Sequence, residues 1–399
     1  MRKQKQVLTI IITFCLLLAA SNAGAQFKVK RLELSSFLSF EEKTFEPFPM
    51  VRYNRVEGLF LGAGLTVNPP MLPAVAFTLR GGYGTGNEEW RYEADIEKSF
   101  FEMNQLQIGA GYFYSTSSLD DWYIGWIENS LAAVLFSNDY MNYFARKGFE
   151  VFINKDFFDN KFRVRLETAN YDYESMPRET NWSLFRRDHK FRLNPQVAEG
   201  NETSLRLTLS YDGRDNPLFP LSGWLIDGIY ERTFNDFETD GLFMTVRRYQ
   251  TTFGSQRVRA KALLGARTGS IAEQHLMDLG GLGTLPGYEI KEYSNGNRLL
   301  LLSLSYQFGG DILSKIPLSF IPIYDAMSLS LFTDSGWLSL VDKDAAIFEG
   351  FDNVRVDHMK TDVGLALSVS EEMLVMKFAK RTDRSEDAWH FLLRLMYKF

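Results

Sequence analysis

The last segment of the chain alternates between apolar and polar side chains up to the C-terminus. One face carries Trp389, Phe391, Leu393, Leu395, Tyr397 and Phe399, opposite His390, Arg394 and Lys398. A period-two pattern predicts a β-strand with one apolar face. The apolar face begins and ends in aromatic residues, which suits a strand that crosses two membrane interfaces about 25 Å apart with a polar lumen behind it. This segment therefore favours a strand of a membrane barrel.

The same pattern recurs along the chain. In "EWRYEADIEK" (89–98) and "TSLRLTLSYD" (203–212), apolar and polar side chains again take opposite faces. A soluble β-sandwich would also alternate, but its outer face meets water and needs no aromatic girdles. Beyond residue 25 the chain has no apolar run of 18 residues, and in hydrocarbon only a closed barrel satisfies the backbone of every strand. We therefore predict an all-β fold, a transmembrane antiparallel β-barrel of the outer-membrane type.

Counting the alternating segments predicts about sixteen strands. They lie near 29–39, 51–67, 74–83, 89–100, 105–115, 143–156, 161–173, 203–212, 223–234, 242–254, 257–269, 297–309, 325–333, 361–370, 372–382 and 388–399. Long connections, including 116–142, 174–202, 270–296 and 334–360, then fall at one end, and short turns such as "EMNQ" and "FFDN" at the other. Outer-membrane barrels have long external loops and short periplasmic turns, so both termini are predicted to be periplasmic.

The first residues predict export. Arg2, Lys3 and Lys5 precede an apolar run from 7 to 20, and an Ala-x-Ala site follows at 23–25. This predicts a signal peptide over residues 1–25 and a barrel over 26–399. The single cysteine lies in the leader, so disulfides cannot stabilise the exported chain. The net charge of −6, which becomes more negative once the basic leader is removed, argues against nucleic acid as a partner.

The stretch "SYDGRDNPLFPLSGW" (210–224) interrupts two alternating segments with six turn-forming residues. Asp215 and Asn216 can accept hydrogen bonds from backbone N–H groups nearby, while Pro217 and Pro220 restrict the backbone. We interpret this connection as a device that fixes the register of the two strands it joins.

Three motifs resemble those of BamA-like outer-membrane assembly barrels, the bacterial surface antigen superfamily. The turn resembles the family's Y-D-x-R-D-N-x-x-x-P-x-x-G pattern, with Tyr211, Asp212, Arg214, Asp215, Asn216, Pro220 and Gly223 matching. "GGLGTLPGY" resembles the family's long-loop motif, and it contains Gly280, Gly281, Pro286, Gly287 and Tyr288. "FTDSG" resembles the family's F-x-D-x-G, with Phe332, Asp334 and Gly336. Phe399 looks like the terminal aromatic residue that the barrel-assembly machinery reads during biogenesis.

The resemblance implies a barrel that aids insertion or translocation of outer-membrane material, in contact with outer-membrane lipids and with a separate periplasmic accessory protein. That partner is expected because the strands begin within a few dozen residues of Gln26, which leaves no room for periplasmic POTRA domains. Pro286 stands where the family has an arginine that contacts the aspartate on the later strand, here Asp334. We expect the loop to fold into the lumen, and Asp334 to bond another cation or the backbone N–H groups near Gly287 and Tyr288.

Other chemistry finds little support. The four histidines lack metal-ligand spacing, no Gly-x-Ser-x-Gly elbow is present, and "GGYGTG" (81–86) is not followed by a βαβ unit. We therefore predict no catalytic residue, no cofactor and no metal. The segment 120–136 predicts an external helix, capped by Asp120 or Asp121, that covers the barrel mouth. A passive channel or a structural barrel remains the alternative to an assembly factor.

Overall fold

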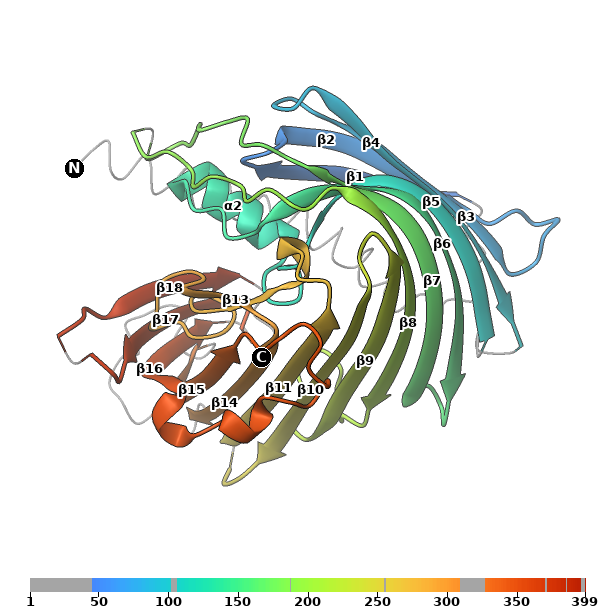
Figure 1. Ribbon diagram of the computed structural model, residues 1–399. Helices are drawn as coiled ribbons and strands as arrows, with labels where there is room; N and C mark the ends of the chain where they lie inside the picture. Colours follow the sequence, from blue (N-terminus) through green and yellow to red (C-terminus); the bar gives the residue numbers. More distant parts are fainter. Residues whose placement is uncertain are drawn as a thin grey trace.

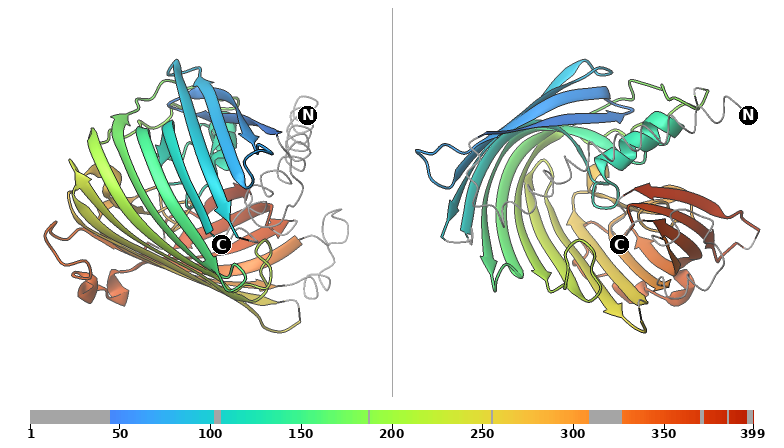
Figure 2. Two further views of the ribbon diagram at one scale, coloured as in Figure 1. Left: turned by 90° about the vertical axis from the view of Figure 1, so that its right-hand side faces the viewer. Right: turned by 180° about the vertical axis from the view of Figure 1, so that it is seen from behind.

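The structure is a computed structural model, which describes residues 45–101, 106–186, 188–254, 256–308, 327–369, 372–384, 386–395 and 399. Sixteen antiparallel strands form one sheet that curls into a barrel (Figure 1, Figure 2). They are β1 (Phe45–Asn54), β2 (Gly58–Val67), β3 (Val75–Gly84), β4 (Glu89–Phe100), β5 (Leu106–Ser118), β6 (Tyr143–Phe157), β7 (Phe162–Ser175), β8 (Gly200–Asp212), β9 (Gly223–Asn235), β10 (Thr239–Thr251), β11 (Arg257–Gly269), β14 (Arg298–Phe308), β15 (Met327–Ser339), β16 (Lys360–Val369), β17 (Leu374–Arg381) and β18 (His390–Leu395). The predicted fold class and strand number are confirmed.

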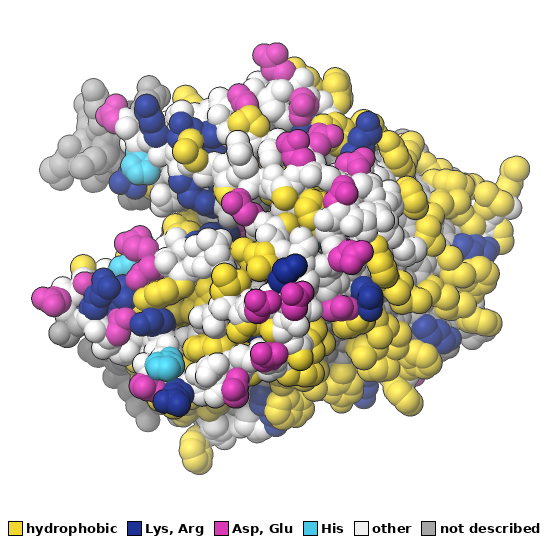
Figure 3. Space-filling model, in the orientation of Figure 1, with side chains coloured by type: hydrophobic (Ala, Val, Ile, Leu, Met, Phe, Trp, Pro, Cys, Tyr) yellow, Lys and Arg dark blue, Asp and Glu magenta, His cyan; other side chains and the backbone are white. Residues whose placement is uncertain are grey.

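The two faces of the sheet differ as the alternation predicts. Outward side chains are large and apolar, with Trp90 and Phe391 respectively 65% and 55% exposed. Apolar side chains cover much of the outer surface over the early strands (Figure 3). Many inward side chains are polar and paired, and Arg80 on β3, for example, contacts both Glu93 and Asp95 on β4 at 2.8 Å. An apolar exterior around a polar lumen is the arrangement that lipid requires.

The first hairpin differs from the prediction. The segment 51–67, predicted as one strand, is divided between β1 and β2, and the strand predicted at 29–39 lies outside the described residues. The Asn54 side-chain oxygen accepts the N–H groups of Val56 and Glu57 at 3.0 and 2.7 Å, and Gly58 has a φ of +65°. This tight turn preserves the alternation on both sides, so periodicity alone does not reveal it.

The long connections lie together at one end of the barrel, which we call the long-loop end. Residues 119–142 include helix α2 (Trp126–Phe136), and residues 270–297 include η2 (Glu273–His275) and a small sheet of β12 (Met277–Leu279) and β13 (Tyr293–Gly296). The connection from β15 to β16 contains η4 (Phe351–Asn353) and η5 (Val356–His358). The opposite end, which carries the 213–222 turn, we call the short-turn end. Within the described residues, no helix is both long and apolar enough to cross a membrane.

One side of the barrel is joined differently from the rest. Strand pairing runs in order from β1 to β18, and among the described residues no ladder joins β18 back to β1. Helix α2 lies between these two strands (Figure 1), and the molecular surface is indented on this side (Figure 3). We call this place the seam.

Candidate functional site

The turn between β8 and β9 is closed by its own acidic side chains. Asp212 accepts two hydrogen bonds from the guanidinium of Arg214, at 2.8 and 2.7 Å. Oδ1 of Asp215 accepts the N–H groups of Leu221 and Ser222 at 3.0 and 3.1 Å, across the whole turn. Burial alone would raise the pKa of Asp215, but backbone N–H groups outweigh it and hold the pKa below its usual value. These bonds fix how the two strands meet.

The remaining residues of this motif complete the turn. The side-chain oxygen of Asn216 accepts the N–H groups of Leu218 and Phe219 at 2.8 and 3.2 Å. The carbonyl of Pro220 accepts a bond from Arg257, at the start of β11. Gly223 has a φ of +115°, and a Cβ there would lie 2.3 Å from the carbonyl oxygen of Gly213, so only glycine fits. The whole motif therefore acts on the geometry of the barrel wall.

The long loop between β11 and β14 packs into the barrel. Leu285 and Tyr288 are almost fully buried, in an apolar cluster with Leu279, Leu299 and Leu301. The N–H of Tyr288 donates to the carbonyl of Leu285 at 3.0 Å, closing a four-residue turn that has Pro286 as its second residue. Gly280 and Gly281 have φ values of 121° and 84°, which side chains rarely adopt.

Glycines in the loop and in the wall allow the two to touch. A Cβ on Gly287 would lie 2.8 Å from both the backbone nitrogen of Arg381 and the Cβ of Asp362. A Cβ on Gly336 of β15 would lie 2.6 Å from the side chain of Leu279. The loop motif and the strand motif, far apart in sequence, therefore form one contact surface.

The polar contact of the loop tip differs from the expected one. Asp362 on β16, rather than its cross-strand neighbour Asp334, accepts the N–H of Gly287 at 2.6 Å. Asp334 is buried beside it on β15. The acceptor is displaced by one strand because the tip lies over β16 and β17, where the hydroxyl of Tyr288 also donates to the carbonyl of Thr361 at 3.1 Å.

A cation from the wall occupies the neighbourhood of the loop tip. The guanidinium of Arg381 at the end of β17 lies 4.1 Å from the centre of the Tyr288 ring. It also pairs with Glu292 of the loop at 3.0 Å and with Asp383 at 2.7 Å. Asp383 lies in the turn after β17. Hydrogen bonds from Arg381 lower the pKa of its carboxyl group to about 2. Nothing local in the sequence marks Arg381 as a contact of the loop.

Phe332 and Phe399 face the lumen. Phe332 is 8% exposed, and the ammonium of Lys377 lies 4.8 Å from its ring centre. Phe399, predicted to end the lipid-facing row of the last strand, is instead 8% exposed and packs against Tyr249. The described part of β18 is His390–Leu395 within the predicted strand 388–399, and residues 396–398 of that prediction lie outside the described residues. Cationic side chains of the lumen attract the terminal ring inward.

Helix α2 bridges the seam by side-chain bonds to both strand edges. Ser130 Oγ accepts the backbone N–H of Tyr53 on β1 at 3.0 Å. Glu128 Oε1 accepts the backbone N–H of Leu395 on β18, also at 3.0 Å. On each edge, the helix thus satisfies one backbone N–H that a neighbouring strand would normally bond.

A buried ion pair holds the helix to β18. Glu128 and Arg394 pair at 2.7 Å, with their side chains respectively 7% and 4% exposed. The same guanidinium donates to the carbonyls of Tyr123 and Leu282 at 2.6 and 3.0 Å. Arg394 therefore joins the last strand, the α2 segment and the long loop. Its partner lies 266 positions away, so the sequence carries no signal for the contact.

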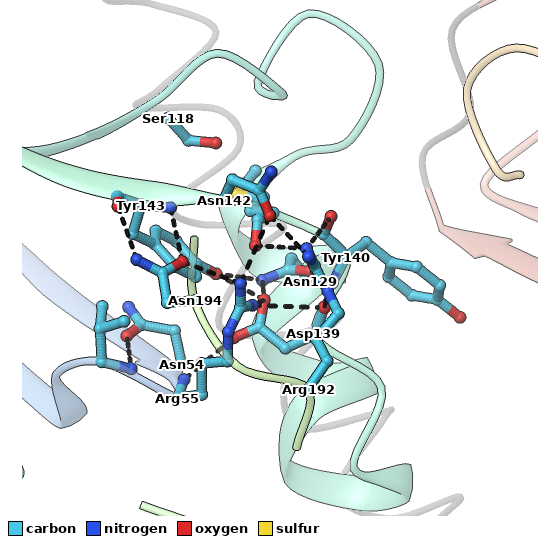
Figure 4. A network of polar contacts seen from close by, with 12 residues as sticks. Asn54, Arg55, Ser118, Asn129, Asp139, Tyr140, Asn142, Tyr143, Arg192 and Asn194 are labelled. Atoms are coloured by element: carbon cyan, nitrogen blue, oxygen red, sulfur yellow. Dashed lines mark hydrogen bonds and ion pairs between the residues drawn. The ribbon is translucent and has the colours of Figure 1, made fainter. Parts of the chain in front are cut away.

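A second polar network anchors the other end of α2 (Figure 4). Arg55, in the turn between β1 and β2, pairs with Asp139 at 3.1 Å, and both side chains are fully buried. Asn194, in the connection between β7 and β8, accepts a hydrogen bond from Arg55 at 2.9 Å and donates one to the carbonyl of Tyr143 at 2.7 Å. Arg192 donates to carbonyls of Asp139, Tyr140 and Met141. The pKa of Arg192 is lowered, mainly by burial and then by the nearby positive charge of Arg55.

The helix begins later than predicted. Its N-cap is Gly125, without a side-chain cap, rather than Asp120 or Asp121. Asp120 instead accepts the N–H of Asn142 at 2.6 Å and pairs with Lys291 of the long loop at 2.7 Å. These tertiary contacts take the carboxylate away from the helix. The described residues contain no cluster of His, Cys, Asp and Glu side chains suited to a metal ion.

The apolar exterior, polar lumen and sixteen antiparallel strands define an outer-membrane β-barrel whose lumen is capped by an inward-folded loop. The chain belongs to the Omp85 superfamily: the model of the Omp85 superfamily domain matches residues 62–387. This localises the protein to the outer membrane.

A comparison with solved structures found similar chains. The crystal structure of BamA from Haemophilus ducreyi lacking POTRA domains 1–3 aligns with a TM-score of 0.57 at 14% identity, over 94% of this chain and 78% of that chain. CdiB from Acinetobacter baumannii gives 0.43 at 10% identity, over 88% and 60% of the two chains. CdiB from Escherichia coli gives 0.43 at 12% identity, over 89% and 62%. No curated protein matches the sequence. At 14% identity, the likeness to the BamA barrel shows the fold alone.

Proposed function

We propose that this barrel aids insertion or translocation of outer-membrane material, acting with a separate periplasmic partner protein. The observation that carries the proposal is the seam, where α2 side chains take the place of a strand ladder. Membership of the Omp85 superfamily and the likeness to the BamA barrel support it. The function requires no catalytic step.

The seam is weaker than the rest of the wall for a physical reason. The pairing of β1 with β2 extends over Phe45–Asn54, and that of β6 with β7 over Phe144–Phe157. At the seam, the described bonds from strand backbone to α2 are those of Tyr53 and Leu395. Releasing a helix from two edges breaks far fewer backbone bonds than separating two paired strands. The released edges would expose unpaired N–H and C=O groups inside the membrane, and an incoming strand could bond to them.

The orientation follows from the lengths of the connections. Long loops of outer-membrane barrels face the exterior, and short turns face the periplasm. On this basis the short-turn end, with the 213–222 turn, faces the periplasm and both termini lie on that side. The proposed partner would dock at the short-turn end, where Leu218, Phe219 and Leu221 are exposed.

Locking the seam tests the proposal. The exported chain is predicted to lack cysteine, so Glu128→Cys with Arg394→Cys can be joined by a reducible bis-maleimide cross-linker in cells that lack the wild-type protein. A matched control joins Ser204→Cys to Thr233→Cys, which are cross-strand neighbours on β8 and β9, away from the seam. We expect the seam lock to lower the abundance of other outer-membrane components, reduction to restore it, and the control link to leave it unchanged.

Two outcomes would overturn the proposal. Unchanged outer-membrane composition with the seam fully cross-linked would mean that the seam does not open during function. Ion conductance in planar bilayers that the lock does not alter, together with no periplasmic protein recovered by cross-linking in cells, would favour the passive channel.

A further inference from the structure

The segment 182–190, in the connection between β7 and β8, lies along the C-terminal end of α2. The backbone N–H groups of Leu184 and Phe185 donate to carbonyls in the last turn of α2, at 2.7 and 3.2 Å. The hydroxyl of Ser183 accepts a hydrogen bond of 2.6 Å from the C-cap residue of α2. The segment is therefore held to the helix that bridges the seam, and the two lie side by side (Figure 1, Figure 2).

The turn at the end of this segment is positively charged. Arg186, His189 and Lys190 are exposed, and the N–H of His189 donates to the carbonyl of Arg186 at 3.0 Å. Asp188 is also exposed, but within the part of the chain that the structure describes no ion pair joins it to Arg186 or Lys190. Lys, Arg and His side chains gather on this rim of the indentation (Figure 3). The turn therefore offers cationic donors to an anion from outside.

Aromatic side chains lie beside the charged turn on the surface. Trp182 is 51% exposed, although its backbone carbonyl is fixed by a 2.6 Å bond from the hydroxyl of Tyr53 on β1. Phe185 is 42% exposed and packs against the equally exposed Phe136 at the end of α2, with ring centres 6.3 Å apart. Clustered apolar side chains that stay exposed on a fixed backbone indicate an interaction surface.

Helix α2 has the reverse of the polarity that water requires. Its polar residues Glu128 and Asn129 are buried, whereas Ile127 is 40% exposed. Leu131 and Leu135, four and eight positions after Ile127 on the same face, are half-buried. A surface helix in water would expose its polar face and bury its apolar face. The exposed face of α2 is therefore suited to acyl chains, and the helix adjoins β1 of the lipid-facing wall.

We propose that a phosphate-bearing lipid of the outer leaflet binds at the seam, with its phosphate on Arg186 and Lys190 and its acyl chains on the exposed face of α2. A soluble anion would leave the apolar surface uncovered, and an uncharged lipid would leave the cations without an anion. The lipid covers both, and by covering α2 it favours the closed seam. The choice of leaflet rests on the orientation given with the proposed function, in which the long-loop end faces the exterior.

Lipid binding to the purified barrel tests the site. The exported chain is refolded in uncharged detergent, and native mass spectrometry measures its binding of diphosphorylated lipid A, of the same lipid without phosphates, and of inorganic phosphate. The site variants are Arg186→Gln with Lys190→Gln for the phosphate and Ile127→Gln for the acyl chains. The matched control, Lys343→Gln with Arg355→Gln, removes the same charges from exposed positions in the β15–β16 connection at the same end of the barrel.

We expect wild type to bind the phosphorylated lipid about thirtyfold more tightly than the lipid without phosphates, since two basic side chains contact the headgroup. Arg186→Gln with Lys190→Gln should abolish this preference, Ile127→Gln should weaken the binding of both lipids, and the control variant should bind as wild type does. Heat-modifiable gel migration verifies the folding of each barrel. Equal binding of the two lipids by wild type, an equal loss in the control variant, or inorganic phosphate that competes as well as the lipid would each overturn the proposal.

Labelling in intact cells tests the leaflet. Asp188→Cys places a thiol in the charged turn of a chain that is predicted to lack cysteine after export. We expect a membrane-impermeant maleimide to label it in intact cells, and labelling only after the outer membrane is opened would overturn the assignment to the outer leaflet. Lipid binding in detergent does not depend on opening of the seam. A lipid site found together with an unaltered outer membrane in the seam experiment would therefore overturn the proposed function alone, and the opposite pair of results would overturn this site alone.

Discussion

The Glu128–Arg394 pair provides a quantitative test of how the seam is held. Both side chains are nearly inaccessible to solvent, and the carboxylate also accepts the backbone N–H of Leu395. Removing one member of a buried ion pair leaves an uncompensated charge and costs about 3–5 kcal/mol. In Glu128→Ala the guanidinium of Arg394 keeps its hydrogen bonds to the carbonyls of Tyr123 and Leu282. We therefore expect the free energy of unfolding to fall by about 3 kcal/mol, at the lower end of this range.

Alanine makes the test strict because it forms helix at least as well as glutamate, so any loss of stability cannot come from helix propensity. The measurement is urea unfolding of the refolded barrel in detergent, followed by tryptophan fluorescence, for Glu128→Ala, Arg394→Ala and the double variant. The double variant should lose less than the sum of the two single variants, because each single variant leaves an unpaired buried charge and the double variant leaves none. Faster proteolysis of residues 119–142 should accompany each loss.

The matched control is the lumen pair Arg80–Glu93, joined at 2.8 Å with side chains 33% and 30% exposed. Partly hydrated pairs contribute about 1 kcal/mol or less, so its coupling energy should be correspondingly small. A coupling energy for Glu128 and Arg394 no larger than that of the control would refute the view that this pair fastens α2 to β18.

Three further predictions concern the wall, the loop and the turn. Leu393→Arg places a cation on the lipid-facing side of β18, where Leu393 is 44% exposed, and should cost about 2–4 kcal/mol in the same urea titration. Gly336→Val brings a side chain onto Leu279, so it should lower the free energy of unfolding by about 1–3 kcal/mol and raise protease cleavage within 270–297. A loop that stays uncleaved would contradict its packing against β15. Because the pKa of Asp215 is lowered in the folded chain, its carboxylate stabilises the fold above the unfolded pKa of about 4, and this is lost as pH falls. Asp215→Asn should therefore be less stable than wild type at pH 7 and equal to it near pH 2; a difference that is independent of pH would show that the charge is irrelevant.

The strand number could be predicted from the sequence because each wall residue faces either lipid or the lumen. Apolar and polar residues therefore alternate with a period of two along each strand. The turn between β1 and β2 was not predicted because it keeps the alternation of the two strands in phase. Asn54 and Gly58 are the residue types that such a turn needs, and their spacing was the available signal.

Contacts between distant loops could not be predicted in the same way. Asp120 has the residue type of a helix cap, yet Asn142 and Lys291 bind its carboxylate, and this preference depends on where two other loops lie. Phe399 continues the apolar face of its strand in sequence, but lumen cations offer its ring a better environment. In each case a tertiary contact overrides a sound local preference.

The loop tip shows how a family contact can persist when its chemistry changes. In related barrels an arginine on the loop is expected to meet an aspartate on the wall, whereas this loop has Pro286 at that position. Here the wall supplies the guanidinium, through Arg381, and the loop supplies the carboxylate, through Glu292, at 3.0 Å. The wall aspartate that meets the tip, Asp362, is bonded by the backbone N–H of Gly287 instead of by a side chain. Because a backbone donor needs close approach, the absence of a side chain at Gly287 is essential for this contact. The loop is therefore held by an ion pair of reversed polarity together with a backbone bond, and proline at position 286 does not imply a loose loop.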